Sequence, residues 1–429
     1  PSPSRTLGDV RSRDEPADSV LLDHIHPTEG WESLMTSMTR RRWLGLLVGT
    51  MTVSASALLA SCGSTESTPT PTAGTAPTPT PAAAASPTAA ATAAETPAAA
   101  SPTAAAAATP TTGVASTVKA RIALTASDAA FLIALDQGMF QDAGITVDLI
   151  TATLDPGQAI SLLGAGQLDL VGGGISAALV NGIKQGVALK IVVAETVITE
   201  DFGNYHVIGV SKSLWDSGEV RSVADLRGKQ IALVTSSGGD VLETKKVLAQ
   251  HGLTLDDVQV QTLRAPDVPA ALQNAAVAAG FLIEPYVTIA LEQLGAAVAL
   301  VDGPAIAQAA GIGLPINVLS FGPRLLDDRP LAVAFLTAYL RGVARYYERI
   351  GDSARRQEIA EVLKKYTPLK DDQLYARMTW PPIARDGRFE PAFLDEYQAL
   401  WTERGQIEET LPADQLVDFS YLEEAARQA

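Results

Sequence analysis

Between residues 119 and 322, short apolar segments typical of strands alternate with longer segments typical of helices. Residues 119–125 (KARIALT) have the pattern of a buried strand, and residues 127–140 have that of a helix capped by Ser127 or Asp128. This alternation predicts an α/β fold with mainly parallel sheets flanked by helices on both faces. A second series starts at residue 205, and the chain returns through 316–322, which predicts two lobes joined by two crossings.

The order of these segments also predicts where one lobe ends and the other begins. We expect lobe 1 to comprise residues 118–205 and 313–429, and lobe 2 to comprise residues 206–312. Ligands of such folds lie in the cleft at the carboxyl ends of the strands. We expect hinge motion at crossings near 206–211 and 313–320 to close the lobes over a ligand.

The single cysteine, Cys62, stands at the end of an apolar segment. Three arginines at 40–42 precede a nearly uncharged run at 43–60, the layout of an export signal. Residues 59–62 (LASC) resemble the lipobox of bacterial lipoproteins, which implies cleavage before Cys62 and acylation of its thiol. Residues 39–44 also resemble a twin-arginine signal. An uncleaved transmembrane helix is the alternative, and both interpretations place the rest of the chain outside the cytoplasm.

The composition on either side of this signal separates three further segments. Residues 1–37 form a polar extension, either non-native or cytoplasmic, to which we assign no function, and residues 38–61 form the signal segment. Residues 62–117 are nearly all alanine, threonine, proline and serine. A segment of this composition cannot form a hydrophobic core. We therefore predict a disordered tether between the membrane and the globular part.

Charge and residue counts argue against several classes of function. The chain has 32 Lys and Arg against 48 Asp and Glu, a net charge of -16, which disfavours binding to nucleic acid. One cysteine leaves no internal disulfide and no multi-thiolate metal site. Neither His206 nor His251, the histidines of the globular part, lies in a recognisable nucleophile or base motif. We therefore expect no metal, no cofactor and no enzymatic activity.

Five segments in a fixed order carry a family resemblance. They are ALDQGMFQDAGITVDLI (134–150), LLGAGQLDLVGGG (162–174), VADLRGKQIAL (223–233), VLAQHGL (247–253) and FLIEPY (281–286). In this order they resemble the solute-binding proteins of nitrate, sulfonate, taurine and thiamine-precursor ABC importers, over residues 119–425. The resemblance implies a monomeric receptor of the periplasmic-binding-protein (Venus flytrap) fold. Such a receptor captures a small molecule outside the membrane and delivers it to an ABC permease.

Four loops that follow strands are the candidate ligand site, because helix N-termini there offer free N–H groups. The candidate residues are Thr125, Ser127 and Asp128; Gly173, Gly174 and Ser176; Thr235, Ser236, Ser237 and Gly238; and Glu284 and Tyr286. Each loop also has a purely structural interpretation, as a helix cap or a tight turn. The glycine run lacks the Lys-Ser/Thr ending of a nucleotide-binding P-loop.

The sequence leaves the ligand and two rival functions open. A pyrimidine-like ligand would stack on aromatic rings, whereas a sulfonate or nitrate would bind hydroxyl and N–H groups, with or without Arg264. One rival is an enzyme like the pyrimidine-precursor synthases of the resembled group, which use an active-site histidine and a cysteine-rich loop. The other is a sensory surface receptor without a permease.

Overall fold

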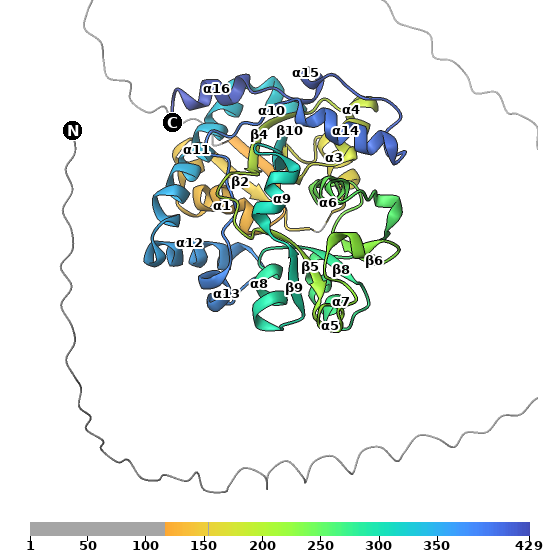
Figure 1. The fold of residues 1–429 in the computed structure, drawn as a ribbon. Coiled ribbons are helices and arrows are strands. Elements are labelled where there is room, and N and C mark those ends of the chain that lie inside the picture. The colour runs from red at the N-terminus through yellow and green to blue at the C-terminus, as the bar shows by residue number, and fades with distance from the viewer. Residues whose placement is uncertain (1–115, 153) are drawn as a thin grey trace, which may run out of the picture. The chain divides into compact units, whose positions relative to one another are not determined.

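The computed structural model describes residues 116–152 and 154–429, and these residues form two α/β lobes (Figure 1). The predicted extension 1–37, the signal segment 38–61 with Cys62, and nearly all of the tether 62–117 lie outside the described residues. In the described part of the chain, we find no helix with the length and apolar character needed to span a bilayer.

Lobe 1 is built on a five-stranded sheet with the order β2-β1-β3-β10-β4. Its strands are β1 (Ser116–Arg121), β2 (Ile145–Leu149), β3 (Leu170–Gly174), β4 (Lys190–Val197) and β10 (Pro315–Phe321). The first three pair in parallel, whereas β10 runs antiparallel to both β3 and β4. The antiparallel strand is the one that returns from the other lobe, and it therefore enters the sheet from the opposite end.

Lobe 2 repeats this plan with the strand order β7-β6-β8-β5-β9. Its strands are β5 (His206–Ser211), β6 (Gln230–Leu233), β7 (Gln259–Thr262), β8 (Ala279–Ile283) and β9 (Ala297–Val301). Here β5 is the antiparallel strand, because it is the first to arrive from lobe 1. The strands of each sheet thus run mainly in one direction, as expected. The exception in each sheet is the strand that follows a crossing, which runs antiparallel to both of its neighbours.

Helices cover both sheets (Figure 1). Those of lobe 1 are η1 (Ala126–Asp128), α1 (Ala129–Asp136), α2 (Met139–Asp142), α3 (Pro156–Gly164), α4 (Ala177–Lys184), α10 (Pro323–Asp327), α11 (Arg329–Ile350), α12 (Ser353–Tyr366), α13 (Asp372–Arg377), α14 (Phe393–Glu403), α15 (Ala413–Leu416) and α16 (Ser420–Ala426). The apolar face of α11 packs on α1 and α2, and the rings of Phe335 in α11 and Phe140 in α2 stack with centroids 4.7 Å apart. This contact anchors the carboxyl-terminal helices to the first sheet.

Shorter helices surround the second sheet. They are α5 (Lys212–Ser217), η2 (Val223–Leu226), α6 (Gly239–Gln250), η3 (Leu255–Asp257), η4 (Ala265–Asp267), α7 (Val268–Gln273), α8 (Tyr286–Thr288), the π-helical turn η5 (Ile289–Gln293) and α9 (Gly303–Ala310). After Glu284 the chain forms a short α-helix that continues directly into a π-helical turn.

The chain passes between the sheets at residues 198–205 and 311–314. The first crossing therefore precedes the position we predicted, because residues 206–211 are strand β5 and are paired along the sheet. The first crossing touches the start of α9: the Gly303 N–H donates to the Asn204 side-chain oxygen at 3.0 Å, and a Cβ on Gly303 would overlap the Gly203 carbonyl oxygen. A glycine is needed at 303 for this approach.

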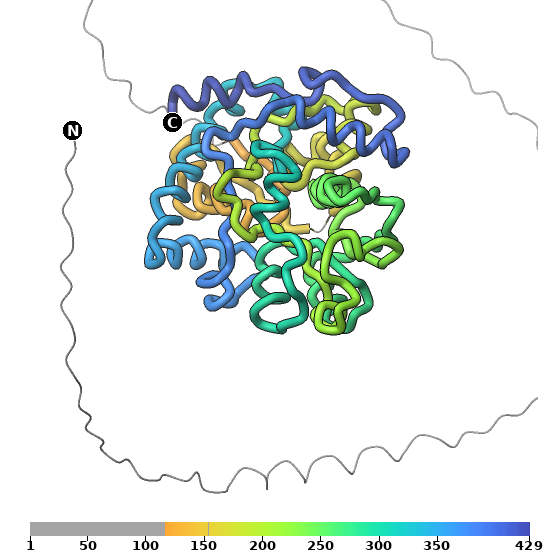
Figure 2. Tube along the Cα trace, viewed as in Figure 1, coloured from red at the N-terminus to blue at the C-terminus, as the bar shows by residue number. Residues whose placement is uncertain are grey.

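The carboxyl-terminal segment runs back across the lobes, as Figure 2 shows in blue. From α14, the Tyr397 hydroxyl donates to the Pro315 carbonyl at 2.8 Å, and the Trp401 indole N–H donates to the Ser237 carbonyl at 2.7 Å. The first contact is at the start of β10 and the second is in lobe 2. Helix α14 therefore bridges the returning strand and the second lobe.

Candidate functional site

A cavity of about 380 Å³ lies between the lobes. The loop after β1 and the start of β10 form its lobe 1 wall, and the loop after β8 forms its lobe 2 wall. Tyr205 of the first crossing, His206 at the start of β5, Ala265 of η4 and residues between 367 and 375 complete its lining. The cavity thus lies where the carboxyl ends of β1 and β8 meet, as expected for this class of fold.

The lobe 1 wall includes two of the predicted site residues, Thr125 and Ser127. The loop is held by Asp128, whose carboxylate accepts from the Thr125 N–H at 2.8 Å. Asp128 is 1% exposed, and burial raises its pKa to about 6. Asp128 does not line the cavity, and in this structure its carboxyl group shapes the loop that does.

The Ser127 hydroxyl and the Tyr205 hydroxyl lie 2.6 Å apart, and both residues line the cavity. Tyr205 is the last residue of the first crossing, and its ring stacks on His206 with centroids 4.9 Å apart. Its pKa is raised by burial, with the nearby carboxyl groups of Asp128, Glu284 and Glu243 adding to the effect. Tyr205 therefore joins the lobe 1 wall to the crossing within an acidic environment.

The lobe 2 wall contains the other two predicted residues found in this cavity, Glu284 and Tyr286. The Glu284 carboxylate accepts from the Thr288 N–H at 3.1 Å, from the Thr288 hydroxyl at 2.9 Å and from the Thr379 N–H at 2.9 Å. Glu284 is 7% exposed, and burial raises its pKa. Because Thr379 belongs to the carboxyl-terminal part of the chain, Glu284 also ties that part to lobe 2.

A buried pair behind the cavity was missed by the sequence analysis. His206 lines the cavity, and its Nδ1 lies 2.8 Å from a carboxylate oxygen of Glu243 in α6. The exposed fractions are 1% and 0%. A histidine that directly precedes the buried run VIGV was the available signal, but only the tertiary structure brings α6 beside it.

The cavity wall carries no lysine or arginine among the described residues. Arg264, the arginine considered for an anionic ligand, has an 82% exposed side chain and pairs with Asp267 at 2.9 Å. It lies next to the wall residue Ala265 but serves as a solvated surface group. An anion in this cavity would have to bind neutral hydroxyl and amide groups.

The glycine loop after β3 lies at a different, smaller cavity of about 60 Å³, on lobe 1. Gly173, Gly174 and Ser176 line it together with Arg121 and Ser320. Gly173 has a φ of +142°, which residues with a side chain rarely adopt. A Cβ on Gly172 would come within 2.8 Å of Leu319. Backbone conformation and packing therefore account for two of the glycines, and ligand contact by this loop stays a prediction.

The loop Thr235–Gly238 lies outside the interlobe cavity, facing the carboxyl-terminal segment. The Ser236 and Ser237 carbonyls accept from Gln406 and Trp401 at 2.9 and 2.7 Å. The buried carboxylate of Asp240 accepts from the Thr235 N–H at 2.9 Å and from the Thr235 hydroxyl. These contacts give the loop a structural role, and a ligand contact there also stays a prediction.

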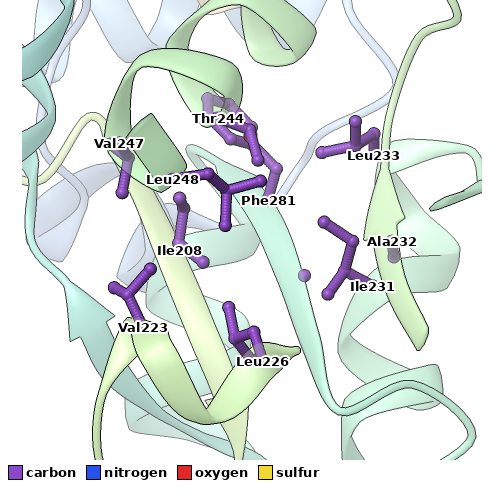
Figure 3. Close-up of a pocket in the computed structure, with 11 residues that line it drawn as sticks. Ile208, Val223, Leu226, Ile231, Ala232, Leu233, Thr244, Val247, Leu248 and Phe281 are labelled. Carbon is purple, nitrogen blue, oxygen red and sulfur yellow. The ribbon is translucent and has the colours of Figure 1, made fainter. Parts of the chain in front are cut away.

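A third cavity, inside lobe 2, is too small for an organic ligand (Figure 3). Its volume is about 10 Å³, and the side chains that converge on it in Figure 3 are apolar apart from Thr244. A single water needs about 10–15 Å³ and several polar partners. This cavity is therefore a packing gap between the second sheet and the helices that cover it.

Comparison with known proteins identifies the family. The model of the family described as NMT1/THI5 like matches residues 126–349, more than half of the chain. The chain is also similar to the solved structure of the periplasmic aliphatic sulphonate binding protein SsuA from Escherichia coli. That match has 19% identity and a TM-score of 0.56, and it covers 70% of this chain and 92% of the other.

Two further solved structures are similar. One is the periplasmic nitrate-binding protein NrtA from Synechocystis PCC 6803, with 13% identity, a TM-score of 0.56 and coverage of 73% and 89%. The other is a ligand binding component of an ABC-type import system from Staphylococcus aureus with zinc bound, with 15% identity, a TM-score of 0.55 and coverage of 73% and 99%. These likenesses show a shared periplasmic-binding-protein fold. Together with the match to the family model, they establish that this chain is a member of the NMT1/THI5-like family.

Proposed function

We propose that the protein is the solute-binding component of an ABC importer, which captures a small organic molecule in the interlobe cavity and delivers it to a membrane permease. The observation that carries this proposal is the position of the cavity: its walls come from both lobes and from the first crossing. A ligand that contacts both walls only when the lobes are close favours the closed state.

The proposal needs no bond to be broken. In the wall, the Glu284 carboxylate accepts from three donors, and His206 is paired with Glu243 through Nδ1. The family membership and the similar fold of import proteins support a transport role. We further propose that the protein acts outside the cytoplasm and is anchored through acylated Cys62.

A cavity-blocking variant tests this function. Ala265 lines the cavity, so Ala265→Trp should abolish binding of any solute that the unmodified protein binds. Ala270, in α7 nearby, is exposed, and Ala270→Trp serves as the matched control that should leave binding intact. Isothermal titration of the full chain with taurine, alkanesulfonates, nitrate, pyrimidines and riboflavin supplies the solutes. Equal binding by both variants would contradict the cavity as the binding site.

A further inference from the structure

The chemistry of the cavity wall narrows the class of solute, provided that the interlobe cavity is the solute site proposed above. Its lining combines apolar residues with three tyrosines, Tyr205, Tyr286 and Tyr375, and with the acidic residue Glu284. Tyr205 ends the first crossing, and Tyr375 lies in α13. Glu284 and Tyr286 directly follow β8. The wall thus offers aromatic faces and a buried acid in one enclosed space.

Carboxyl groups gather around the cavity, and the histidine in its wall, His206, is paired with one of them, that of Glu243. Three carboxyl groups, those of Asp128, Glu243 and Glu284, lie close enough to Tyr205 to raise the pKa of its hydroxyl. No lysine or arginine of the described chain lines the wall. Arg121, the cation near Asp128, directs its guanidinium to the carbonyls of Gly172 and Leu154 and lines the small lobe 1 cavity instead.

This arrangement favours a cation and disfavours an anion. A carboxylate in a desolvated site attracts a positive charge strongly, because water no longer screens the interaction. The negative face of a tyrosine ring attracts cations as well. An anion would lie close to the same carboxylate and would find no lysine or arginine in the described wall. No ion pair with these residues would then offset the free energy lost when the anion leaves water.

We infer that the interlobe cavity selects organic cations with a compact apolar body, such as protonated amines or amidines, and rejects sulfonates, nitrate and carboxylates. Glu284 pairs with the cationic group, and Tyr205, Tyr286 and Tyr375 enclose it. Glu284 can do so while it keeps its three hydrogen bonds to Thr288 and Thr379, because an ionised carboxylate has about four lone-pair directions.

Four probes that share a phenyl ring and differ in the charge of its substituent test this inference. Benzamidine is cationic, benzamide is neutral, and benzoate and benzenesulfonate are anionic. Titrated against the full chain at pH 7, benzamidine should bind at least about tenfold more tightly than benzamide, the range of a charge-assisted hydrogen bond. The two anions should bind more weakly than benzamide. An anion that binds more tightly than benzamidine would overturn the inference and leave the proposed function standing.

Variants of the wall residues identify the side chain that distinguishes the cationic probe from the neutral one. Glu284→Gln should remove the advantage of benzamidine over benzamide, about tenfold, when both affinities are measured on the same variant. Glu408→Gln, which removes an exposed carboxylate outside the cavity, should change neither affinity. Because Glu284 also anchors Thr288 and Thr379, a second variant, Tyr286→Leu, should weaken benzamidine more than benzamide through the lost ring.

Two further outcomes would contradict the inference. If Glu284→Gln and Tyr286→Leu both keep the full preference for benzamidine, the assignment of these residues is wrong. If none of the four probes binds at millimolar concentration, the cavity does not select organic cations of this kind and the inference is overturned, whereas the proposed function is decided by the solute titration of the Ala265→Trp variant. The sign of the preference and the existence of binding are therefore tested separately.

Discussion

The hydroxyl groups of Ser127 and Tyr205 lie 2.6 Å apart, and this buried hydrogen bond joins the first loop of lobe 1 to the crossing that leads into lobe 2. Both residues also line the interlobe cavity. This contact forms part of the cavity wall and also holds the crossing in place. The shape of the candidate site therefore depends on how the chain passes between the lobes.

We expect the loss of either hydroxyl to destabilise the protein. Ser127→Ala and Tyr205→Phe should each lower the free energy of unfolding by about 1 kcal/mol, because each leaves the partner hydroxyl buried without this hydrogen bond. The double variant should cost less than the two single costs added together. Urea unfolding of the four proteins measures this, and strictly additive losses would show that the two hydroxyls do not interact.

The contact between the first crossing and the start of α9 makes position 303 sensitive to any side chain. Gly303→Ala should lower the free energy of unfolding by about 3 kcal/mol or more, because the added Cβ would overlap the Gly203 carbonyl oxygen and the backbone would have to move. Gly351→Ala is the matched control, since a Cβ there meets nothing within 4 Å. Thermal unfolding compares the two variants, and a Gly303→Ala protein as stable as the control would refute the close approach.

Asp240 should make stability fall as the pH rises. Burial raises its pKa from 3.8 to about 6, so the folded protein holds this proton more tightly than the unfolded chain does. Its contribution is complete below the unfolded pKa and is lost as the pH rises through the folded pKa. Between pH 4 and 7, wild type should lose up to about 3 kcal/mol relative to Asp240→Asn.

Asp225 provides the control of opposite sign for this measurement. Its pKa is lowered by hydrogen bonds from Arg221 and Ser222. Its contribution is therefore present above its unfolded pKa and is lost as the pH falls through its folded pKa. In urea unfolding, the difference between wild type and Asp240→Asn should change between pH 4 and 7, whereas the difference for Asp225→Asn should stay nearly constant there and change in the opposite sense only below about pH 4. A difference between wild type and Asp240→Asn that does not vary with pH would contradict the raised pKa.

Cys62 should decide where the protein is found in the cell. If its thiol is acylated, Cys62→Ala should release the protein from the membrane fraction, because the anchor is lost while the globular part is unchanged. Cys62→Ser tests the same thiol with a smaller change in polarity. Fractionation of cells that express each variant supplies the measurement. Retention of both variants in membranes would favour the uncleaved transmembrane helix instead.

Much of the fold could be predicted because it depends on local patterns. Alternating apolar segments predicted both sheets, and the segment 316–322 predicted the strand that returns to lobe 1. The lobe boundaries at 205/206 and 312/313 stay predictions. The position of the first crossing was wrong by several residues, because an apolar run does not show whether it is paired along a sheet or passes between two of them.

The candidate site was predicted less completely. Loops that follow strands could be found from the sequence, and Thr125, Ser127, Glu284 and Tyr286 do line one cavity. The loops at 173–176 and 235–238 have the same sequence character but lie elsewhere, at a lobe 1 cavity and against the carboxyl-terminal segment. No local pattern distinguishes a glycine or serine that faces a ligand from one that faces another part of the chain.

By itself the sequence determined the α/β class, the two-lobed order and the family, because periodicity and motif order are properties of neighbouring residues along the chain. The tertiary structure alone decided which loops share a cavity, the pairing of His206 with Glu243 and the absence of lysine or arginine from the described cavity wall. Those features depend on contacts between residues far apart in the chain, which form only when both sheets and the segment 367–411 pack together.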